Sequence, residues 1–338
     1  GLIKDTKLSF LNKYDIQNLD FIFDFQENYL SISDVTFSLN NLKLLSEKIL
    51  IKKINDQFSI GGNINNKNLD IDKKNLDLLI KPLLPKINLE KLKLSSNNNF
   101  LLKINKKFEV DDFTLESKIS IDEFSIINTL NLKNFLPNIK ENLKFSDHEL
   151  SIKYIKESLY IEGNGDVLLQ DNNDSLTYSF SEKDNIFNFK TSIRINDNPF
   201  KIDFLNFKKN KALIELEGSK NEKKEIYLKF FSINEKKDKI RINNLTLNKK
   251  FEIIKSGGFL LDYIDNANQK NQIKLYPMNN KYILNGSSFN ANNLINDLLF
   301  EDRNSNFLKI DTKIDIDIEK LFLDKEYNLF NLKGDVDF

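Results

Sequence analysis

The sequence predicts an all-β protein, built from an antiparallel sheet with a few short helices. Apolar and polar residues alternate over long stretches of the chain, as in strands that have one buried face. Turn-forming residues interrupt these stretches roughly every 8–14 residues, a spacing typical of a meander. Alanine, the best helix former, occurs only at Ala212, Ala267 and Ala291. These three observations favour strands over helices throughout the chain.

Four alternating segments place large apolar side chains on one face of a predicted strand. They contain Phe21, Phe23 and Phe25; Phe187, Phe189 and Ile193; Ile226, Leu228 and Phe230; and Ile310, Ile314, Ile316 and Ile318. The opposite face of the last segment is charged, from Lys309 to Glu319. Because side chains alternate across a strand, each segment is expected to have one apolar face and one solvent-exposed face.

Turn signals separate these strands. Residues 171–174, 197–199 and 277–280 are each rich in Asp, Asn or Pro, and each is expected to be a turn between two strands. The alternation changes phase at Ser33-Asp34. This change predicts a bulge or a tight bend.

A glycine ends an apolar-x-apolar-x segment at five places. These are Gly62, Gly163, Gly218, Gly286 and Gly334. A glycine in a strand relieves a bulge or lets neighbouring strands bend. The recurrence suggests a repeated strand pair with insertions of variable length. The segment 163–165 lacks the third glycine of a dinucleotide-binding turn and is expected to be a turn or bulge.

Three short segments have helical spacing of their apolar residues. They are residues 75–84, residues 134–143, which include Pro137, and residues 290–300, for which Asn290 is a candidate N-cap. Each is about ten residues long, so these helices are expected to cover parts of a sheet without forming a layer.

The composition excludes many functions. The 338 residues include 50 Lys and Arg, 50 Asp and Glu, one His and no Cys. A zero net charge argues against a nucleic-acid partner. Sites that need cysteines or two histidines are impossible. We therefore expect no catalytic site, no cofactor and no metal.

The remaining candidates for catalysis or ligand binding are better explained by ordinary structural roles. His148 lies in a polar, turn-like stretch and is expected to be a solvated surface histidine. The segment 171–174 lacks the glycine and distal glutamate of a calcium loop. Asp315 and Asp317 are expected to belong to a charged outer face, and Gly257-Gly258 lacks the lysine of a phosphate loop.

Periodicity alone leaves three arrangements open: stacked sandwiches, a closed barrel and a long curled sheet. In a sandwich, the apolar faces bury each other. In a curled sheet, a ligand with alkyl chains has to cover the apolar side, because a large exposed apolar patch is a liability.

The C-terminal part of the chain resembles the bacterial AsmA-like superfamily, in particular its YhdP branch, which is related to TamB and AsmA. The features are a strand with glycine and small polar residues at 282–290, a leucine-rich helix at 294–299, an alternating acidic strand at 310–316 and the glycine-ended strand at 329–336. The earlier strands are similar in style.

This resemblance implies an elongated, highly twisted antiparallel sheet that curls into a groove with an apolar interior. It also implies a non-enzymatic conduit for phospholipids between the inner and outer membranes, located in the periplasm. The apolar residues of the four segments would then contact acyl chains. An anchor in the inner membrane would belong to a part of the chain not present here.

The chain starts without methionine and stops within an alternating segment, so we expect residues 1–338 to be an internal part of one extended β-groove. Possible sub-segments are 1–133, 134–285 and 286–338. The alternative function is a structural or adhesive β-sandwich array on the cell surface, without a lipid ligand. A weaker alternative is a β-enzyme that acts on polysaccharides, against which the absence of tryptophan counts.

Overall fold

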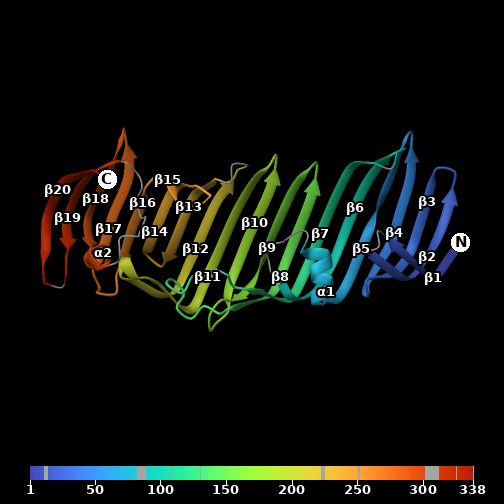
Figure 1. Cartoon of the computed structure of the whole chain (residues 1–338), viewed down its shortest axis with the longest axis horizontal. Helices are drawn as coiled ribbons and strands as arrows, with labels where there is room; N and C mark the ends of the chain where they lie inside the picture. The colour runs from blue at the N-terminus through green and yellow to red at the C-terminus, as the bar shows by residue number, and fades with distance from the viewer. Residues whose placement is uncertain are drawn as a thin grey trace. The chain divides into compact units, whose positions relative to one another are not determined.

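The structure is a computed structural model that describes residues 1–10, 14–81, 89–107, 109–129, 131–221, 225–249, 252–300, 312–324 and 326–337. It confirms the all-β prediction. The described residues form a 20-stranded sheet with few short helices (Figure 1). The chain divides into two compact units, which are residues 1–128, 141–167 and 179–184, and residues 129–140, 168–178 and 185–338.

The first unit is an antiparallel meander in which β1 to β8 pair in chain order. Its elements are β1 (Leu2–Phe10), β2 (Tyr14–Gln26), β3 (Tyr29–Leu39), β4 (Leu42–Ile54), β5 (Gln57–Ile71), α1 (Lys73–Asn75), η1 (Leu76–Ile80), β6 (Leu89–Asn105), β7 (Val110–Ile127), β8 (Asn142–Ile155) and β9 (Ser158–Leu168). Strand β10 (Asp174–Lys183) has residues in both units.

The second unit continues the antiparallel pattern with one exception. Its elements are β11 (Ile186–Ile202), η2 (Asp203–Leu205), β12 (Phe207–Lys220), β13 (Ile226–Glu235), β14 (Asp238–Leu247), β15 (Ile253–Lys255), β16 (Phe259–Ile264), β17 (Lys270–Met278), β18 (Lys281–Asn290), α2 (Asn292–Phe300), β19 (Lys313–Phe322) and β20 (Asn328–Asp337). Strands β18 and β19 pair in parallel. Because α2 lies between them in the chain, this pair has the crossover connection that parallel strands require.

Asparagine and aspartate residues interrupt the regular alternation inside many strands. They adopt left-handed backbone angles at Asn18, Asp34, Asn68, Asp147, Asp197, Asn244 and Asn331. Asn and Asp tolerate this conformation better than other side chains do, and an inserted residue reverses which face the following side chains occupy. The bulge predicted at Ser33-Asp34 is confirmed, since Asp34 has a φ of 51° within β3.

One of the predicted turns is wrong. Residues 197–199 lie inside β11, where the register with β12 shifts between Asn196 and Phe200, so a bulge accommodates the turn-forming residues without ending the strand. Residues 163–165, predicted to be a turn or a bulge, lie within β9. The segments 171–173 and 279–280 do connect consecutive strands, as predicted.

Three of the five recurring glycines, Gly62, Gly218 and Gly286, lie where neighbouring strands change register, whereas Gly334 lies in a β19–β20 pairing without a shift. Gly218 pairs with Leu228 immediately after the register shift in β12–β13, and a Cβ there would lie 2.4 Å from the Tyr227 carbonyl oxygen. Gly62 and Gly286 likewise adjoin shifts in β4–β5 and β17–β18. Glycine therefore allows the close backbone approach that each bulge creates.

Of the three predicted helices, two form. The first consists of α1 and η1, and the last is α2. Residues 134–143 form turns followed by the start of β8, because Pro137 lacks an N–H and interrupts a helical ladder. Leu136 and Ile139 in these turns are nevertheless buried.

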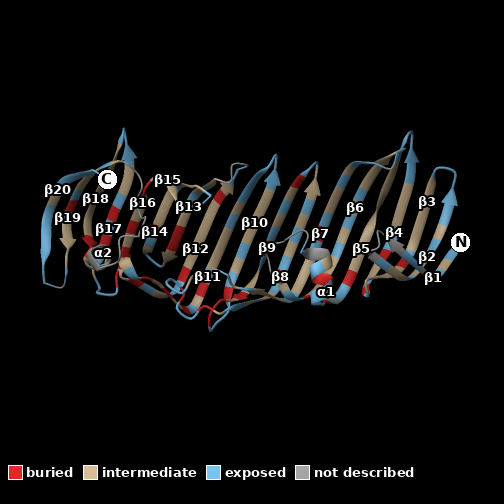
Figure 2. Cartoon of the chain, viewed as in Figure 1, coloured by how far each residue is buried: buried red, intermediate tan, exposed pale blue. Residues whose placement is uncertain are grey.

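Each unit has its own apolar core, and the short helices contribute buried residues to it (Figure 2). In the first unit, Leu76 of η1 packs with Leu42, Ile71 and Leu92 of the sheet. In the second unit, Leu205 of η2 is buried with Phe207 and Tyr263. The short helices therefore cover part of each sheet, as the sequence predicted.

Candidate functional site

A row of residues, aliphatic except for Gly286, crosses the sheet of the second unit. Each member is the direct register partner of the next, and we call this set the first row: Ile193, Ile214, Ile233, Ile240, Leu261, Ile273, Gly286, Ile318 and Leu332. Most members between β13 and β19 are buried. Cross-strand neighbours on one face are close enough to pack against each other, so the row forms a continuous apolar band.

A second row runs beside the first, two residues further along each strand. It consists of Thr191, Leu216, Phe231, Ile242, Phe259, Leu275, Leu284, Ile316 and Gly334. The two rows lie on the same face, because side chains repeat every second residue. Unlike the first row, the second row is only half-buried over β11 to β19. It therefore presents apolar surface that solvent or a ligand can reach.

Aromatic residues bury the edge of the apolar face that lies on the far side of the first row from the second row. The Tyr263 hydroxyl donates a hydrogen bond to the Leu205 carbonyl oxygen at 2.8 Å, and the rings of Tyr263 and Phe207 meet edge to face at 5.4 Å between centroids. Tyr263 has no exposed surface. Burial of apolar surface thus decreases from this buried edge toward the second row.

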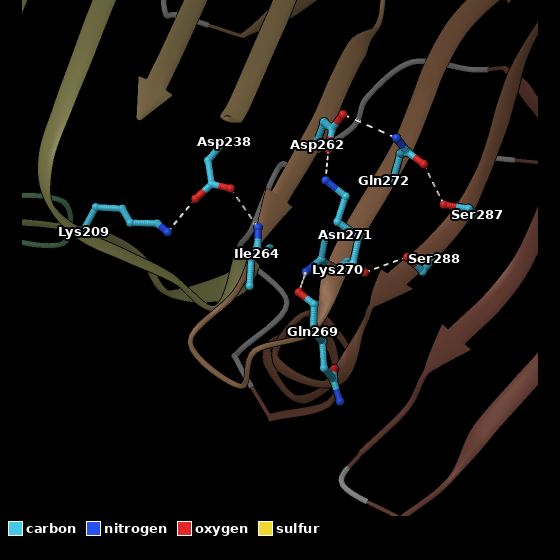
Figure 3. Close-up of polar contacts among 10 residues, drawn as sticks. All are labelled: Lys209, Asp238, Asp262, Ile264, Gln269, Lys270, Asn271, Gln272, Ser287 and Ser288. Atoms are coloured by element: carbon cyan, nitrogen blue, oxygen red, sulfur yellow. Dashed lines mark hydrogen bonds and ion pairs between the residues drawn. The ribbon is translucent and has the colours of Figure 1, made fainter. Parts of the chain in front are cut away.

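The opposite face of the same strands is polar (Figure 3). Asp262 binds Lys270, and the Gln272 side chain connects Asp262 to the Ser287 hydroxyl, which lies 2.8 Å from Gln272 Oε1. Asp238 forms an ion pair of 2.5 Å with Lys209. These charged residues therefore form ion pairs and hydrogen bonds between strands. The sheet has one polar, charged face and one apolar face.

The charged residues of β19 follow the same rule. Asp317 pairs with Lys333 at 3.3 Å, and Lys313 pairs with Asp335 at 2.7 Å. Asp315 pairs with Lys281. The two aspartates thus belong to a lysine-paired outer face, as expected from the sequence.

The first unit carries two comparable rows. The third row is Phe25, Leu30, Ile51, Ile60, Leu102 and Phe113, and the fourth row is Phe23, Ile32, Ile49, Gly62, Phe100, Leu115 and Tyr154. Leu30, Ile51, Ile60 and Leu102 are half-buried, whereas Phe25 is 72% exposed. This face of the first unit therefore also offers accessible apolar surface.

Most of the residues predicted to contact a ligand lie in or beside these rows. Phe21 adjoins the fourth row, and its ring centroid lies 6.2 Å from that of Phe23. Phe187 and Phe189 extend the face of Ile193 along β11, with ring centroids 6.3 Å apart. Ile314, Ile316 and Ile318 share one face of β19. Ile310 lies outside the described residues.

Phe230 departs from its predicted face. The register shift next to Gly218 inserts one residue into β13, so Phe230 no longer lies on the same face as Leu228. Its ring lies 4.2 Å from the guanidinium carbon of Arg241, and Arg241 lies between Ile240 and Ile242 of the two rows. Phe230 is therefore on the polar face, whereas Ile226 and Leu228 pair with Leu247 and Leu245.

Sequence reasoning did not select the central members of the rows on β12, β14, β16 and β17 as ligand contacts. Ile214, Ile240, Leu261 and Ile273 have the same period-two alternation as the selected segments, so the signal was present. Which of these strands adjoin each other in register required the structure.

The prediction of a solvated surface histidine is wrong. His148 has no exposed surface, and its Nε2 lies 3.0 Å from the Asp166 carbonyl oxygen. The rings of Phe124 and Phe145 contact it at centroid distances of 5.5 and 5.7 Å. A Cβ on Gly165 would lie 2.4 Å from the imidazole, so the glycine leaves room for the ring. The left-handed Asp147 turns His148 inward, which the polar sequence around it concealed.

We expect His148 to make the first unit less stable in mild acid. Burial lowers the pKa of the imidazole below its usual value of 6.5, and the hydrogen bond to Asp166 opposes this only in part. Below about pH 6.5 the unfolded chain therefore binds a proton that the folded chain does not, so the free energy of unfolding falls. Urea unfolding at pH 7.5 and 5.5 measures this, with His148→Gln as the non-titrating control. An identical pH dependence in both proteins would contradict it.

Asp174, the last residue of the predicted turn at 171–174 and the first of β10, is hydrogen-bonded to β11. Asp174 Oδ1 accepts hydrogen bonds from the Asn196 backbone N–H at 2.8 Å and from Asn198 Nδ2 at 2.9 Å. Burial raises the pKa of this carboxyl group. Among the residues that the structure describes, no group of three or more His, Asp or Glu side chains is arranged to hold a metal ion.

The comparisons with known proteins give no relative. No protein-family model matches the sequence, and no curated protein or solved structure is significantly similar to it. In the described part of the chain, no helix has both the length and the apolar character needed to cross a membrane. The AsmA-like family membership stays a prediction from the sequence.

Proposed function

We propose that this chain is a non-enzymatic conduit for phospholipids, which binds their acyl chains along the apolar rows. The observation that carries the proposal is the second row, an apolar band that continues across the paired strands of the second unit and is only half-buried. An alkyl chain that lies on this row would remove it from water. Its charged head group would remain beyond the rows, where it keeps its hydration.

Similar contacts along the second row would allow an acyl chain to move along it. Each buried methylene contributes about 0.8 kcal/mol, so several together hold an acyl chain firmly. Because Leu275, Leu284 and Ile316 are alike in size and chemistry, an alkyl chain makes nearly equal contacts at successive strands. Uniform binding of this kind favours sliding over a single fixed site.

The partial exposure of the second row supports a conduit over the alternative of stacked sandwiches. In a sandwich, a facing sheet buries the inner residues of both sheets. Phe231, Ile242 and Phe259 are half-buried instead. A lipid ligand accounts for this exposed apolar surface, whereas an array of sandwiches without a ligand leaves it unexplained.

We further propose, from the resemblance to the AsmA-like proteins, that transport occurs in the periplasm between the inner and outer membranes. Parts of the protein not present here would contact these membranes. Catalysis, cofactors and nucleic-acid partners have no place in this function.

Photocrosslinking in cells that make the protein tests the proposal. A photoreactive amino acid at Ile316 or Phe189, on the apolar face, is expected to capture phospholipid, which mass spectrometry of the adduct identifies. The same amino acid at Lys313 is the matched control, because Lys313 lies on the opposite face of β19 from Ile314 and Ile316. It is expected to capture little phospholipid. Equal capture at Ile316 and Lys313 would contradict an acyl-chain path along the rows.

A further inference from the structure

Four polar residues interrupt the apolar face of the first unit. They are Asn66 on β5, Ser96 and Asn98 on β6, and Ser117 on β7, and we call them the polar cluster. Asn66 pairs in register with Ser96, and Asn98 pairs with Ser117. Asn98 precedes Phe100 of the fourth row by two residues, so the cluster and the row share a face.

The polar cluster lies among apolar neighbours. The adjoining positions on the same face are Ile64, Phe100, Ile119 and Ile152. Ser117 and Asn66 are buried, with relative exposures of 4% and 7%, whereas Ser96 and Asn98 are half-buried and accessible. In the second unit, the first and second rows carry aliphatic or aromatic residues except at Thr191, Gly286 and Gly334. Polar groups at such positions are costly unless they are paired.

The hydrogen bonds inside the cluster leave specific groups for another molecule. The amide nitrogens of Asn66 and Asn98 both donate to Ser96 Oγ, at 2.5 and 2.7 Å, and Asn98 also donates to the Ile64 carbonyl oxygen at 2.7 Å. Ser96 Oγ thus accepts two bonds and keeps its proton to donate. Asn98 keeps its carbonyl oxygen as an acceptor, and the buried Asn66 Oδ1 has no partner among the described residues.

We propose that the polar cluster binds a hydroxyl group of an acyl lipid whose alkyl chain lies on the third and fourth rows. A hydroxyl both donates and accepts a hydrogen bond. It can donate to Asn98 Oδ1 and accept from the Ser96 hydroxyl. This inference rests on the proposed function, because it requires the rows to hold an alkyl chain.

The neutral character of the cluster decides which polar group fits. An anionic phosphate or carboxylate calls for a cation, and an ammonium group calls for a carboxylate. The cluster contains only amides and hydroxyls, and its neighbours on the same face are apolar. A neutral hydroxyl meets its hydrogen-bonding groups without bringing an unpaired charge into an apolar surrounding.

A pair of small amphiphiles tests this inference. The chain contains no cysteine, so Leu115→Cys introduces a single site for a polarity-sensitive dye, two residues from Ser117. Dissociation constants are measured for 1-dodecanol and for dodecyl methyl ether, which lacks the donor. We expect the alcohol to bind about fivefold more tightly, the ratio given by one net hydrogen bond of about 1 kcal/mol.

Two variants locate the effect. In Ser96→Ala/Asn98→Leu the alcohol and the ether are expected to bind equally, because the hydroxyl partners are gone. The control Asn97→Leu/Asn99→Leu changes the same strand on its other face and is expected to keep the fivefold difference. Thermal unfolding of each variant checks that it folds. A wild-type chain that binds both compounds equally would overturn the polar site alone, whereas failure to bind either would also contradict the proposed function in this unit.

Discussion

Aspartate at both Leu284 and Ile316 is expected to weaken acyl-chain binding to the second unit at least about tenfold. The two residues are register partners in the second row, so the variant places two charges where an alkyl chain would lie. Losing the contacts of only two methylenes costs about 1.6 kcal/mol, which already exceeds the 1.4 kcal/mol of a tenfold change. Titration with a fluorescent fatty acid measures the affinity.

The control for this variant is Ile283→Asp/Asn285→Asp, which adds the same number of charges on the other face of β18. It is expected to bind the fatty acid with nearly wild-type affinity. Because Leu284 and Ile316 are half-buried, the test variant is expected to stay folded, and its circular dichroism checks this. Equal losses of affinity in both variants would show that net charge, and not the second row, determines binding.

Replacement of Tyr263 by alanine is expected to lower the free energy of unfolding of the second unit by about 3–5 kcal/mol, the usual cost of removing a buried aromatic ring. Tyr263 has no exposed surface, and its hydroxyl donates to the Leu205 carbonyl oxygen. The ring therefore holds η2 against the sheet. Urea unfolding, followed by far-ultraviolet circular dichroism, measures the loss.

Tyr263→Phe separates the ring from its hydroxyl group. This variant keeps the contact with Phe207 and leaves the Leu205 carbonyl oxygen without its partner, so a smaller loss of about 1–3 kcal/mol is expected. If alanine and phenylalanine cost the same, the ring does not pack as described. If neither changes stability, the buried edge of the apolar face is not formed as the structure has it.

Much of the fold follows from the local alternation of apolar and polar residues. The period of two identifies most of the strands, and it places Ile314, Ile316 and Ile318 on one face of β19, as the structure does. Helical spacing of apolar residues predicts the helices that form at η1 and α2. These features depend on residues close together in the sequence.

The errors come from bulges and from contacts between distant segments. Asp197 and Asp147 look like turn residues, yet their left-handed conformation is absorbed inside a strand. His148 follows the left-handed Asp147, and Phe230 changes face because the register shift next to Gly218 inserts one residue into β13. The parallel pairing of β18 with β19 has no local signal, since an antiparallel neighbour would show the same alternation.

The rows themselves were only partly predictable. Sequence analysis selected Ile193 and Ile316 but could not place them on bands that cross many strands, because register depends on bulges and glycines such as Gly218. The polar cluster was not identified at all. Asparagine is abundant in this chain, so Asn66 and Asn98 do not stand out until their neighbours across the sheet are known.

The central claim is that the apolar rows hold lipid, and native mass spectrometry of the purified chain, combined with organic extraction, tests it most directly. The account predicts phospholipid bound to the wild-type chain and to Ile283→Asp/Asn285→Asp, with much less on Leu284→Asp/Ile316→Asp. A wild-type chain that is folded and stable but carries no lipid, and takes up none from phospholipid vesicles, would contradict the account.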